Sequence, residues 1–596
     1  MKATNPVAAG TALLAAILMS SSEAQAQSID WAEFAVDNTR MVSTNAVGLG
    51  DIREKDYATG DFDRDGWIDL ISVRKQPFTT TGRYRNVLFM NRSGVLTDES
   101  SSFAASTDVP GDNGFLTPTN DRDVAVGDFD QDGWLDFVTA TTFTPGQSKA
   151  LSHPRVYMNL GEVGGVWQGF FYQEARIPDW GTYPNMCGVA VGDVTGDGFP
   201  DIYFSHYEQQ ANVDLNDRLL INDGMGFFTD ESSSRMSLPM LASSFGTSAV
   251  ISDMNGDGVN DVVSVSGSGQ TGGLTRSSIS YNNPSNEGFF NILQIPYDGA
   301  PYHVATGDLN GDDRLDMILS DDADDRYLLN QGNNAFGRVI WGPARTYGTD
   351  DGFGSNNYIR DLNGDGFDEA IICDVDVDLD GCDRRLHIYH NRGGTIGGDV
   401  TLREETLGSI RGARGLPSLR GTHDVAIFDI DNDGDQDMVV GRCGGTSVYL
   451  NQRDSIGEDY CDASANSSGS AARISAVGSP LLSDNSMTLR VEGAPAGVFG
   501  FFLVSRDRGL IQNPAGSAGD LCLGGSIGRF VAPGQVVASS LQGVMTLPID
   551  LTALPIGTGT IAGAVGDTFS FTAWFRDTIF GAATSNFANG VTVSLR

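Results

Sequence analysis

Basic residues are scarce in this sequence, which has 38 lysines and arginines against 77 aspartates and glutamates and a net charge of −39. A chain this acidic repels phosphate backbones and anionic lipid headgroups, so we expect no nucleic-acid partner. High acidity is also typical of disordered chains, but 40% of the residues are hydrophobic and 9% are aromatic, which favours a folded protein. The acidic residues therefore need another explanation.

Long apolar runs are also lacking. After the first 26 residues no stretch approaches the ~18 apolar residues that a membrane-spanning helix needs, so we expect no membrane span. The short apolar run at residues 7–19 follows Lys2 and precedes Ala24-Gln25-Ala26, which is the pattern of a secretory signal peptide. We expect residues 1–26 to be cleaved and the mature protein to be secreted, that is, extracellular or periplasmic.

The short motifs of common enzymes do not occur. There is no G-x-S-x-G segment, no H-E-x-x-H segment, no phosphate loop and no dinucleotide fingerprint, and those are the local signatures of many hydrolases, zinc proteases and nucleotide-binding enzymes. Enzymes that act on polysaccharides use scattered residues, so catalysis stays open. Helical periodicity is missing as well.

What the sequence does have is one acidic segment repeated seven times. The first aspartates of successive copies lie 53 to 68 residues apart. The copies read GDFDRDGWIDL, GDFDQDGWLDF, GDVTGDGFPDI, SDMNGDGVNDV, GDLNGDDRLDM, RDLNGDGFDEA and FDIDNDGDQDM. Repetition at a fixed period is the signature of a repeat architecture.

A second recurring mark is a short apolar segment that ends in asparagine, such as VLFMN, RVYMN and RLLIN. Short apolar runs also flank each acidic segment, and turn-forming residues separate them, which is typical of antiparallel strands. Each repeat therefore predicts four strands, and seven such repeats predict an all-β, seven-bladed β-propeller. Blade seven lacks a fourth strand of its own, and residues 31–37 at the mature N-terminus are predicted to supply it.

The acidic segments are predicted to be calcium loops. Oxygen-bearing side chains occupy positions 1, 3, 5 and 9, and glycine usually occupies position 6, where a tight turn is needed; Ca²⁺ takes six to eight oxygen ligands. No segment has the glutamate at position 12 that an EF-hand uses. We expect up to seven structural Ca²⁺ ions, which would stabilise the folded state by mass action. The predicted ligands are Asp61, Asp63, Asp65 and Asp69; Asp128, Asp130, Asp132 and Asp136; Asp193, Thr195, Asp197 and Asp201; Asp253, Asn255, Asp257 and Asp261; Asp308, Asn310, Asp312 and Asp316; Asp361, Asn363, Asp365 and Glu369; and Asp429, Asp431, Asp433 and Asp437.

Three of these loops depart from the pattern. Thr195 is a poorer ligand than aspartate, so loop three is expected to bind calcium most weakly. Loop five has Asp313 in place of the glycine, and aspartate tolerates the left-handed conformation better than most residues. Loop six closes with the longer Glu369.

Over residues 29–455 the repeats resemble those of the FG-GAP/VCBS family, the integrin-α-like calcium-loop propellers that also occur in many secreted bacterial proteins. This resemblance implies the propeller fold and the calcium. It implies nothing specific about a ligand.

Two sets of residues are candidates for ligand binding. The loops between second and third strands vary in length and should lie on the face opposite the calcium loops, and they contain Arg83, Tyr84, His206 and Tyr207. His303 and His423 belong to a second set at the mouth of the central channel. The loop from Cys373 to Cys382 has three aspartates in calcium-like spacing, and either an extra cation site or a solvated acidic loop fits it. We expect disulfides Cys373–Cys382 and Cys461–Cys522.

The remaining sequence predicts a linker over residues 456–469 and a β-sandwich-like domain over residues 470–596, where short β patterns recur. The expected domains are thus a signal peptide at 1–26, the propeller at 27–455, the linker and the C-terminal domain. Two functions fit. The first is an extracellular binding or adhesion protein for a glycan or protein ligand; the alternative is a polysaccharide-acting enzyme, a lyase or hydrolase, with its site at the channel mouth.

Overall fold

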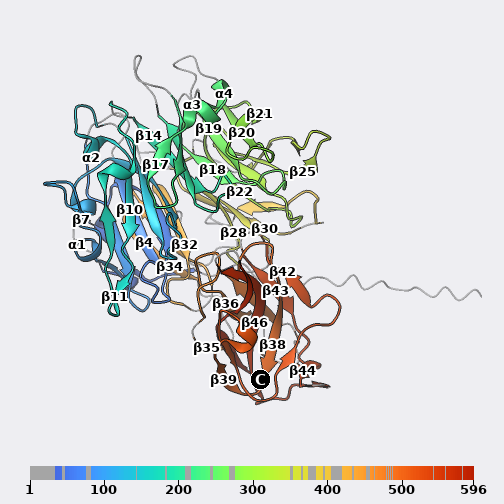
Figure 1. Ribbon diagram of the computed structural model, residues 1–596. Helices are drawn as coiled ribbons and strands as arrows, with labels where there is room; N and C mark the ends of the chain where they lie inside the picture. Colours follow the sequence, from blue (N-terminus) through green and yellow to red (C-terminus); the bar gives the residue numbers. More distant parts are fainter. Residues whose placement is uncertain are drawn as a thin grey trace, which may run out of the picture. The chain divides into compact units, whose positions relative to one another are not determined.

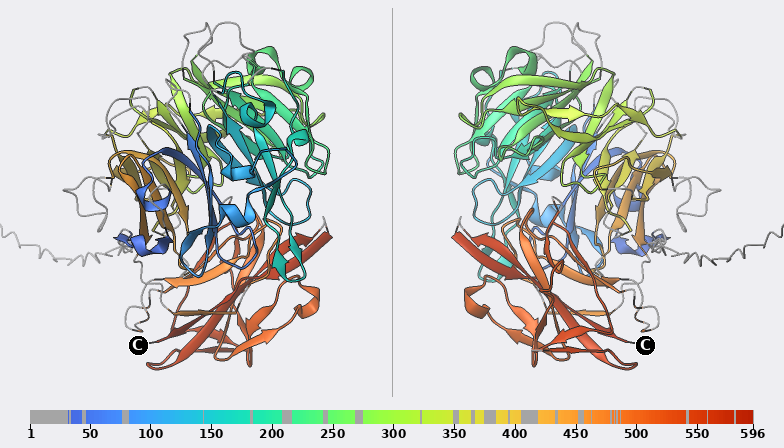
Figure 2. Two further views of the ribbon diagram at one scale, coloured as in Figure 1. Left: turned by 90° about the vertical axis from the view of Figure 1, so that its left-hand side faces the viewer. Right: turned by 90° about the vertical axis from the view of Figure 1, so that its right-hand side faces the viewer.

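The computed structural model describes residue 32 and residues 34–595, with gaps at 43–46, 76–81, 143, 182–183, 208–215, 242–245, 268–274, 322, 349–353, 364–366, 374–383, 394–395, 405–418, 433–434, 452–456, 462, 478–479, 481, 483–484, 486, 541–542, 558 and 580–581. The expected all-β fold is confirmed, because the described elements are strands apart from short single-turn helices. The predicted signal peptide lies outside the described residues. The strands between residues 34 and 451 and those between 458 and 594 form separate sheets (Figures 1 and 2).

Seven four- or five-stranded sheets contain most of the described strands between residues 34 and 451, and each contains one copy of the repeat. We call these sheets blades. Blade one comprises β2 (Met41–Val42), β3 (Glu54–Gly60), β4 (Asp69–Lys75), β5 (Val87–Asn91) and β6 (Leu96–Asp98). Blade two comprises β7 (Ser106–Thr107), β8 (Asp121–Gly127), β9 (Asp136–Thr141), β10 (Arg155–Asn159) and β13 (Phe170–Tyr172). Blade three comprises β14 (Met186–Gly192), β15 (Asp201–His206), β16 (Arg218–Asn222) and β17 (Phe228–Asp230).

The other four blades have the same antiparallel order. Blade four comprises β18 (Ala249–Ser252), β19 (Asp261–Ser266), β20 (Arg276–Asn282) and β21 (Phe290–Tyr297). Blade five comprises β22 (Pro301–Gly307), β23 (Asp316–Asp321), β24 (Arg326–Leu328) and β27 (Arg345–Thr346). Blade six comprises β28 (Asn357–Arg360), β29 (Glu369–Cys373), β30 (Leu386–Asn391) and β31 (Leu402–Glu404). Blade seven comprises β32 (Thr422–Phe428), β33 (Asp437–Arg442), β34 (Gly445–Asn451) and β1 (Phe34–Val36).

The blades form a closed ring. The first strand of each blade packs beside the next blade, and β3 of blade one packs against both β8 of blade two and β32 of blade seven. The apolar core is divided accordingly into seven clusters, each of which lies between two neighbouring blades. Radial closure of this kind protects the sheet edges. The N-terminal strand β1 pairs with β34 of blade seven, with Phe34 opposite Asn451.

Short elements decorate the ring. Two hairpins, β11–β12 (Glu162–Val163 and Val166–Trp167) and β25–β26 (Asn330–Asn333 and Val339–Trp341), extend from blades two and five. The α-helices are single turns: α1 (Ser100–Phe103), α2 (Lys149–Ser152), α3 (Ser232–Arg235) and α4 (Leu238–Leu241).

The C-terminal strands form two main sheets on one core. The larger sheet contains β35 (Glu458–Tyr460), β38 (Phe499–Ser505), β41 (Gly528–Arg529), β42 (Val536–Ala538), β46 (Thr568–Ile579), β47 (Ala582–Phe587) and β48 (Gly590–Ser594). The smaller sheet contains β36 (Arg473–Val477), β37 (Thr488–Glu492) and β43 (Met545–Pro548), and two hairpins, β39–β40 (Arg508–Ile511 and Leu521–Leu523) and β44–β45 (Leu554–Ile556 and Gly559–Ile561), complete the domain. Buried side chains of both sheets share one cluster that includes Leu489, Phe502 and Phe571.

Candidate metal centres

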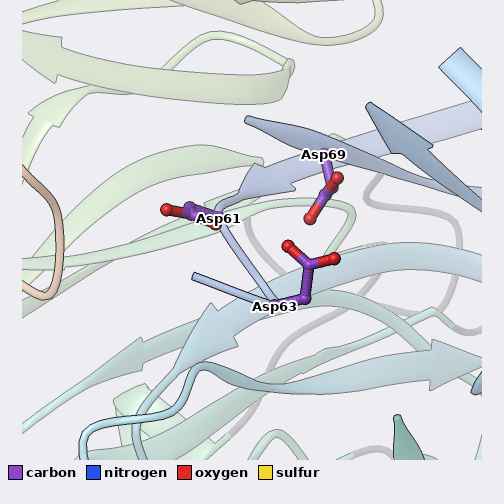
Figure 3. Close-up of side chains that lie close together, drawn as sticks. All are labelled: Asp61, Asp63 and Asp69. Atoms are coloured by element: carbon purple, nitrogen blue, oxygen red, sulfur yellow. The ribbon is translucent and has the colours of Figure 1, made fainter. Parts of the chain in front are cut away.

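Each acidic segment forms the loop between the first and second strands of its blade. In loop one, Asp61 and Asp63 lie between β3 and β4, and Asp69 begins β4. Figure 3 shows these three side chains close together, with the carboxylates of Asp63 and Asp69 facing each other. Their ligand oxygens lie within 4.8 Å of one another, and the same holds for the sets Asp128, Asp130, Asp136 and Asp429, Asp431, Asp437. Loops one, two and seven therefore bring three carboxylates to one point.

The turn at the centre of each loop requires a left-handed residue, as the sequence predicts. Position 6 has φ values of 89°, 90°, 92° and 93° at Gly66, Gly133, Gly198 and Gly258. Asp313, which replaces glycine in loop five, has a φ of 60°, so the expectation that aspartate adopts this conformation there is confirmed. The corresponding glycines of loops six and seven lie outside the described residues, as do the predicted ligands Asp365 and Asp433.

The position-1 carboxylate organises the backbone of its own loop. In loops one to five its Oδ2 accepts the backbone N–H of position 6 at 2.6–3.1 Å. In two of these loops the Oδ1 atom of the same carboxylate has no such hydrogen bond among the described residues. Asp61 Oδ1 and Asp128 Oδ1 are buried and have no hydrogen-bond partner among the described residues.

Buried oxygens without a donor occur in two further loops, at Asp431 Oδ1 and Asn310 Oδ1, again within the described part of the chain. A buried acceptor without a donor costs free energy, and a cation satisfies it. Burial, together with the charge of nearby Asp65, raises the pKa of Asp61 to about 6, and burial likewise raises that of Asp128 to about 6. These oxygens therefore fit a hard cation such as Ca²⁺.

The position-9 acid has a role that the sequence did not reveal. In all seven loops it is fully buried, and it accepts two backbone N–H groups, one from position 2 of its loop and one from the recurring asparagine of its repeat. In loop two, Asp136 accepts from Phe129 N at 2.8 Å and from Asn159 N at 2.7 Å. This acid therefore ties the loop to the blade whether or not it also binds metal.

The recurring asparagine links neighbouring blades. Its Nδ2 donates to the position-2 carbonyl of the preceding blade at 2.6–3.2 Å in all seven repeats. Asn91 of blade one donates to Ile430 O of blade seven, so the hydrogen bonds run around the whole ring. Because position 2 adjoins the first predicted metal ligand, these asparagines connect each loop to the loop of the preceding blade.

The candidate ligand residues between second and third strands differ in exposure. His206 and Tyr207 are fully buried, so neither side chain is exposed for contact with a ligand. Arg83 is exposed and Tyr84 is partly exposed. The Arg83 guanidinium donates to Gln147 Oε1 at 3.2 Å, and the Arg53 guanidinium lies 4.4 Å from the centre of the Tyr84 ring.

The channel mouth is a buried network of charged groups. Lys75 Nζ lies 3.4 Å from Glu54 Oε1 and 3.5 Å from Asp56 Oδ2, and the Tyr358 hydroxyl donates to Asp424 Oδ1 at 2.6 Å. Glu54 and Asp56 are thus paired within blade one, and Asp424 of blade seven is paired with Tyr358 of blade six, which is a structural role.

Burial lowers the pKa of both channel histidines. Burial, with the positive charges of Lys75 and Arg122, lowers the pKa of His303 to about 3. Burial, with the charge of Lys55, lowers the pKa of His423 to about 3. An efficient general base has a pKa near the working pH, so neither imidazole is suited to that task at neutral pH.

The cysteines bear out one expected pairing and contradict the other. Cys461 and Cys522 form a disulfide within the C-terminal domain, as predicted. Cys373 is a buried thiol at the end of β29, so the expected Cys373–Cys382 disulfide is wrong. The acidic loop that follows Cys373 lies outside the described residues. Disulfides are typical of oxidising compartments, and no helix in the described part of the chain is long and apolar enough to cross a membrane.

The ring of blades and its acidic loops define a repeat β-propeller with candidate metal centres. The FG-GAP-like repeat family matches residues 61–139 and 253–319, which contain loops one, two, four and five. These two stretches are therefore similar to FG-GAP-like repeats. No curated protein matches it. Among solved structures, a similar chain is described as the structure of the Dos1 propeller, with 10% identity, coverage of 70% of this chain and 94% of that chain, and a TM-score of 0.34.

Proposed function

We propose that the protein is a secreted, calcium-stabilised propeller that acts as an extracellular binding or adhesion protein. The main support for calcium binding is that three loops each bring oxygens of three carboxylates within 4.8 Å of one another. Carboxylates this close repel one another unless a proton or a cation neutralises them. The bound ion would be held by the loop acids and would fix the loop that joins the first two strands.

The binding role is supported by the arrangement of the two faces. The C-terminal domain contacts loops of the calcium face, where Arg473 Nη2 donates to Gly66 O of loop one at 2.5 Å. Loops between second and third strands lie at the other end of the blades, because strand direction alternates. Variable loops on a rigid scaffold commonly carry recognition, so we place the glycan or protein ligand on that face, with Arg83 and Tyr84 as candidate contacts.

Native mass spectrometry of the mature protein tests the calcium. We expect several bound Ca²⁺ ions, their loss in chelator, and a melting temperature that falls by many degrees when they are lost. Two or fewer ions, with no effect of chelator on melting, would show that the acidic loops are not calcium sites. N-terminal sequencing of exported protein tests the compartment, and we expect it to begin at Gln27.

A screen of the calcium-loaded protein against glycans and cell-surface polymers, scored for binding and for breakdown, tests the ligand face. We expect binding without breakdown, and Arg83→Ala should weaken it while melting and calcium content stay unchanged. Arg506→Ala is the matched control, because Arg506 is an exposed arginine of the C-terminal domain. Breakdown that His303→Ala or His423→Ala abolishes would instead establish the enzymatic alternative.

A further inference from the structure

Loop six differs from the other loops in the exposure of its first aspartate. Asp361 is buried, with 7% of its surface exposed, whereas the first aspartate of each of the other six loops is partly exposed. The group that covers Asp361 comes from the C-terminal domain. Arg490 of β37 places its Nη1 at 2.5 Å from Asp361 Oδ2.

The Arg490 guanidinium is enclosed by acids. Only 3% of its side chain is exposed, and its Nη2 also lies 2.5 Å from Glu492 Oε1. A buried arginine is stable only when its charge is compensated, so the fold depends on Asp361 as a partner of Arg490. In loops one to five the corresponding Oδ2 accepts a backbone N–H of its own loop.

Two neighbouring contacts reach the same end of the propeller. Arg473 donates to Gly66 O in loop one, and Gln436 Nε2 of loop seven donates to Glu492 Oε2 at 3.0 Å. The C-terminal domain thus contacts loops one, seven and six, which are consecutive around the ring. Asp361 is the one of these contacts that is also a predicted calcium ligand.

We propose that Arg490 is the cation of loop six: its guanidinium neutralises Asp361 in place of calcium and so docks the C-terminal domain on the propeller. This inference rests on the proposed calcium binding of the other loops. Ca²⁺ on the other oxygen of Asp361 would lie only a few ångströms from the guanidinium on Oδ2, and two positive charges this close in a buried site repel each other strongly. Calcium in loop six and a docked C-terminal domain therefore exclude each other, and the docked protein holds at most six ions in its repeat loops.

The test counts calcium in the full mature chain by native mass spectrometry in excess Ca²⁺. Asp128→Asn should lower the count by one, because loop two is a calcium site. Asp361→Asn should leave the count unchanged, because no ion is lost from loop six. A count that falls by one in Asp361→Asn overturns the inference and leaves the calcium of the other loops intact.

Replacing Arg490 removes the guanidinium from loop six. Arg490→Gln should raise the count by one and increase the radius of gyration in X-ray scattering, since the docking contact is lost. Arg506→Gln is the control, because Arg506 pairs with Asp567 within the C-terminal domain at 2.8 Å, and it should change neither quantity. A folded Arg490→Gln protein with an unchanged count overturns the inference; if that variant does not fold, the Asp361→Asn count decides. Wild-type protein without calcium would overturn the proposed function itself.

Discussion

At the scale of single residues, the position-9 acid serves the backbone as well as the predicted metal site. The sequence identifies it only as an oxygen ligand that closes the loop. The structure shows that both carboxylate oxygens of Asp136 already accept buried N–H groups. Asp130 of the same loop accepts a single N–H, from Asp132 at 3.3 Å, on an exposed stretch. The two aspartates should therefore respond differently to removal of calcium.

Asp136→Ala should destabilise the protein with or without calcium, by about 3 kcal/mol or more, because it leaves two buried N–H groups without an acceptor. Asp130→Ala should destabilise it only when calcium is present, because it removes a metal ligand and little else. Urea unfolding of both variants, with calcium and with chelator, measures the difference. Equal losses from the two variants in chelator would contradict the structural role of Asp136.

The contact between His153 and Trp180 is expected to weaken at acid pH. Its buried ring stacks on the Trp180 ring at 5.3 Å between ring centres, and its Nε2 accepts the backbone N–H of Trp180 at 3.3 Å. Burial lowers its pKa from 6.5 to about 4. Because the folded pKa lies below the unfolded one, the unfolded chain binds the proton more readily, so stability is lost as the pH falls below 6.5.

Lowering the pH from 7 to 5 should therefore cost about 2 kcal/mol at His153. The measurement is the free energy of unfolding across this range for wild type and His153→Gln. Glutamine keeps an acceptor but does not titrate, so the variant should show a flatter pH dependence. An identical slope in both proteins would exclude His153 as the sensitive group.

At the scale of strands and loops, the recurring asparagine of each repeat joins the blades. In blade four, Asn282 Nδ2 donates to Val194 O of blade three at 2.7 Å and to Asn260 O at 2.9 Å, and its Oδ1 accepts the N–H of Gly288 at 2.8 Å. Its neighbour Asn283 lies on the turn, where its side chain accepts one N–H from Ser285.

Asn282→Ala should lower the free energy of unfolding by about 2–4 kcal/mol, since several buried hydrogen bonds are lost together. Asn283→Ala should cost under about 1 kcal/mol, because its single hydrogen bond is exposed. Chemical unfolding of the two variants side by side is the measurement. Similar small losses from both would mean that the asparagine ring contributes little to stability.

The strands and loops were predictable from the sequence, but hydrogen bonds between residues of different repeats were not. Strands and acidic loops follow from local patterns, and the φ of Asp313 follows from its position alone. The recurring asparagine was recognisable in the sequence, but the carbonyl that accepts its hydrogen bond lies in the preceding blade. For Asn282 this acceptor is Val194 O, 88 residues away. A local pattern contains no information about that pairing.

At the scale of the whole molecule, seven copies of the repeat predicted an all-β propeller, because each blade can bury its faces only against its neighbours. Long-range contacts were not predictable. Arg490 lies 129 residues from Asp361, and nothing near either residue in the sequence marks the pair. Cys373 was assigned a nearby cysteine by proximity in sequence, and the structure instead buries it as a thiol. His206 was a candidate ligand contact because it borders a variable loop, but it is the last residue of β15 and is buried.

Closure of the ring depends on the N-terminal strand. Phe34 pairs with Asn451 on β34, is 1% exposed, and packs in a cluster with Ile388 and Tyr449 between blades six and seven. Val36, two residues on, is 57% exposed. The strand therefore covers the edge of blade seven and also fills the last interface between blades.

Deleting residues 27–40 should leave β34 as an open edge, and open edges pair with other chains. We expect a lower melting temperature, faster cleavage by trypsin and aggregates in size-exclusion chromatography. Phe34→Ala should reproduce part of this loss, about 3–5 kcal/mol, because it leaves a cavity between two blades, whereas Val36→Ala should cost less than about 0.5 kcal/mol. A truncated protein that melts and resists trypsin like the mature chain would show that the ring closes without its N-terminal strand.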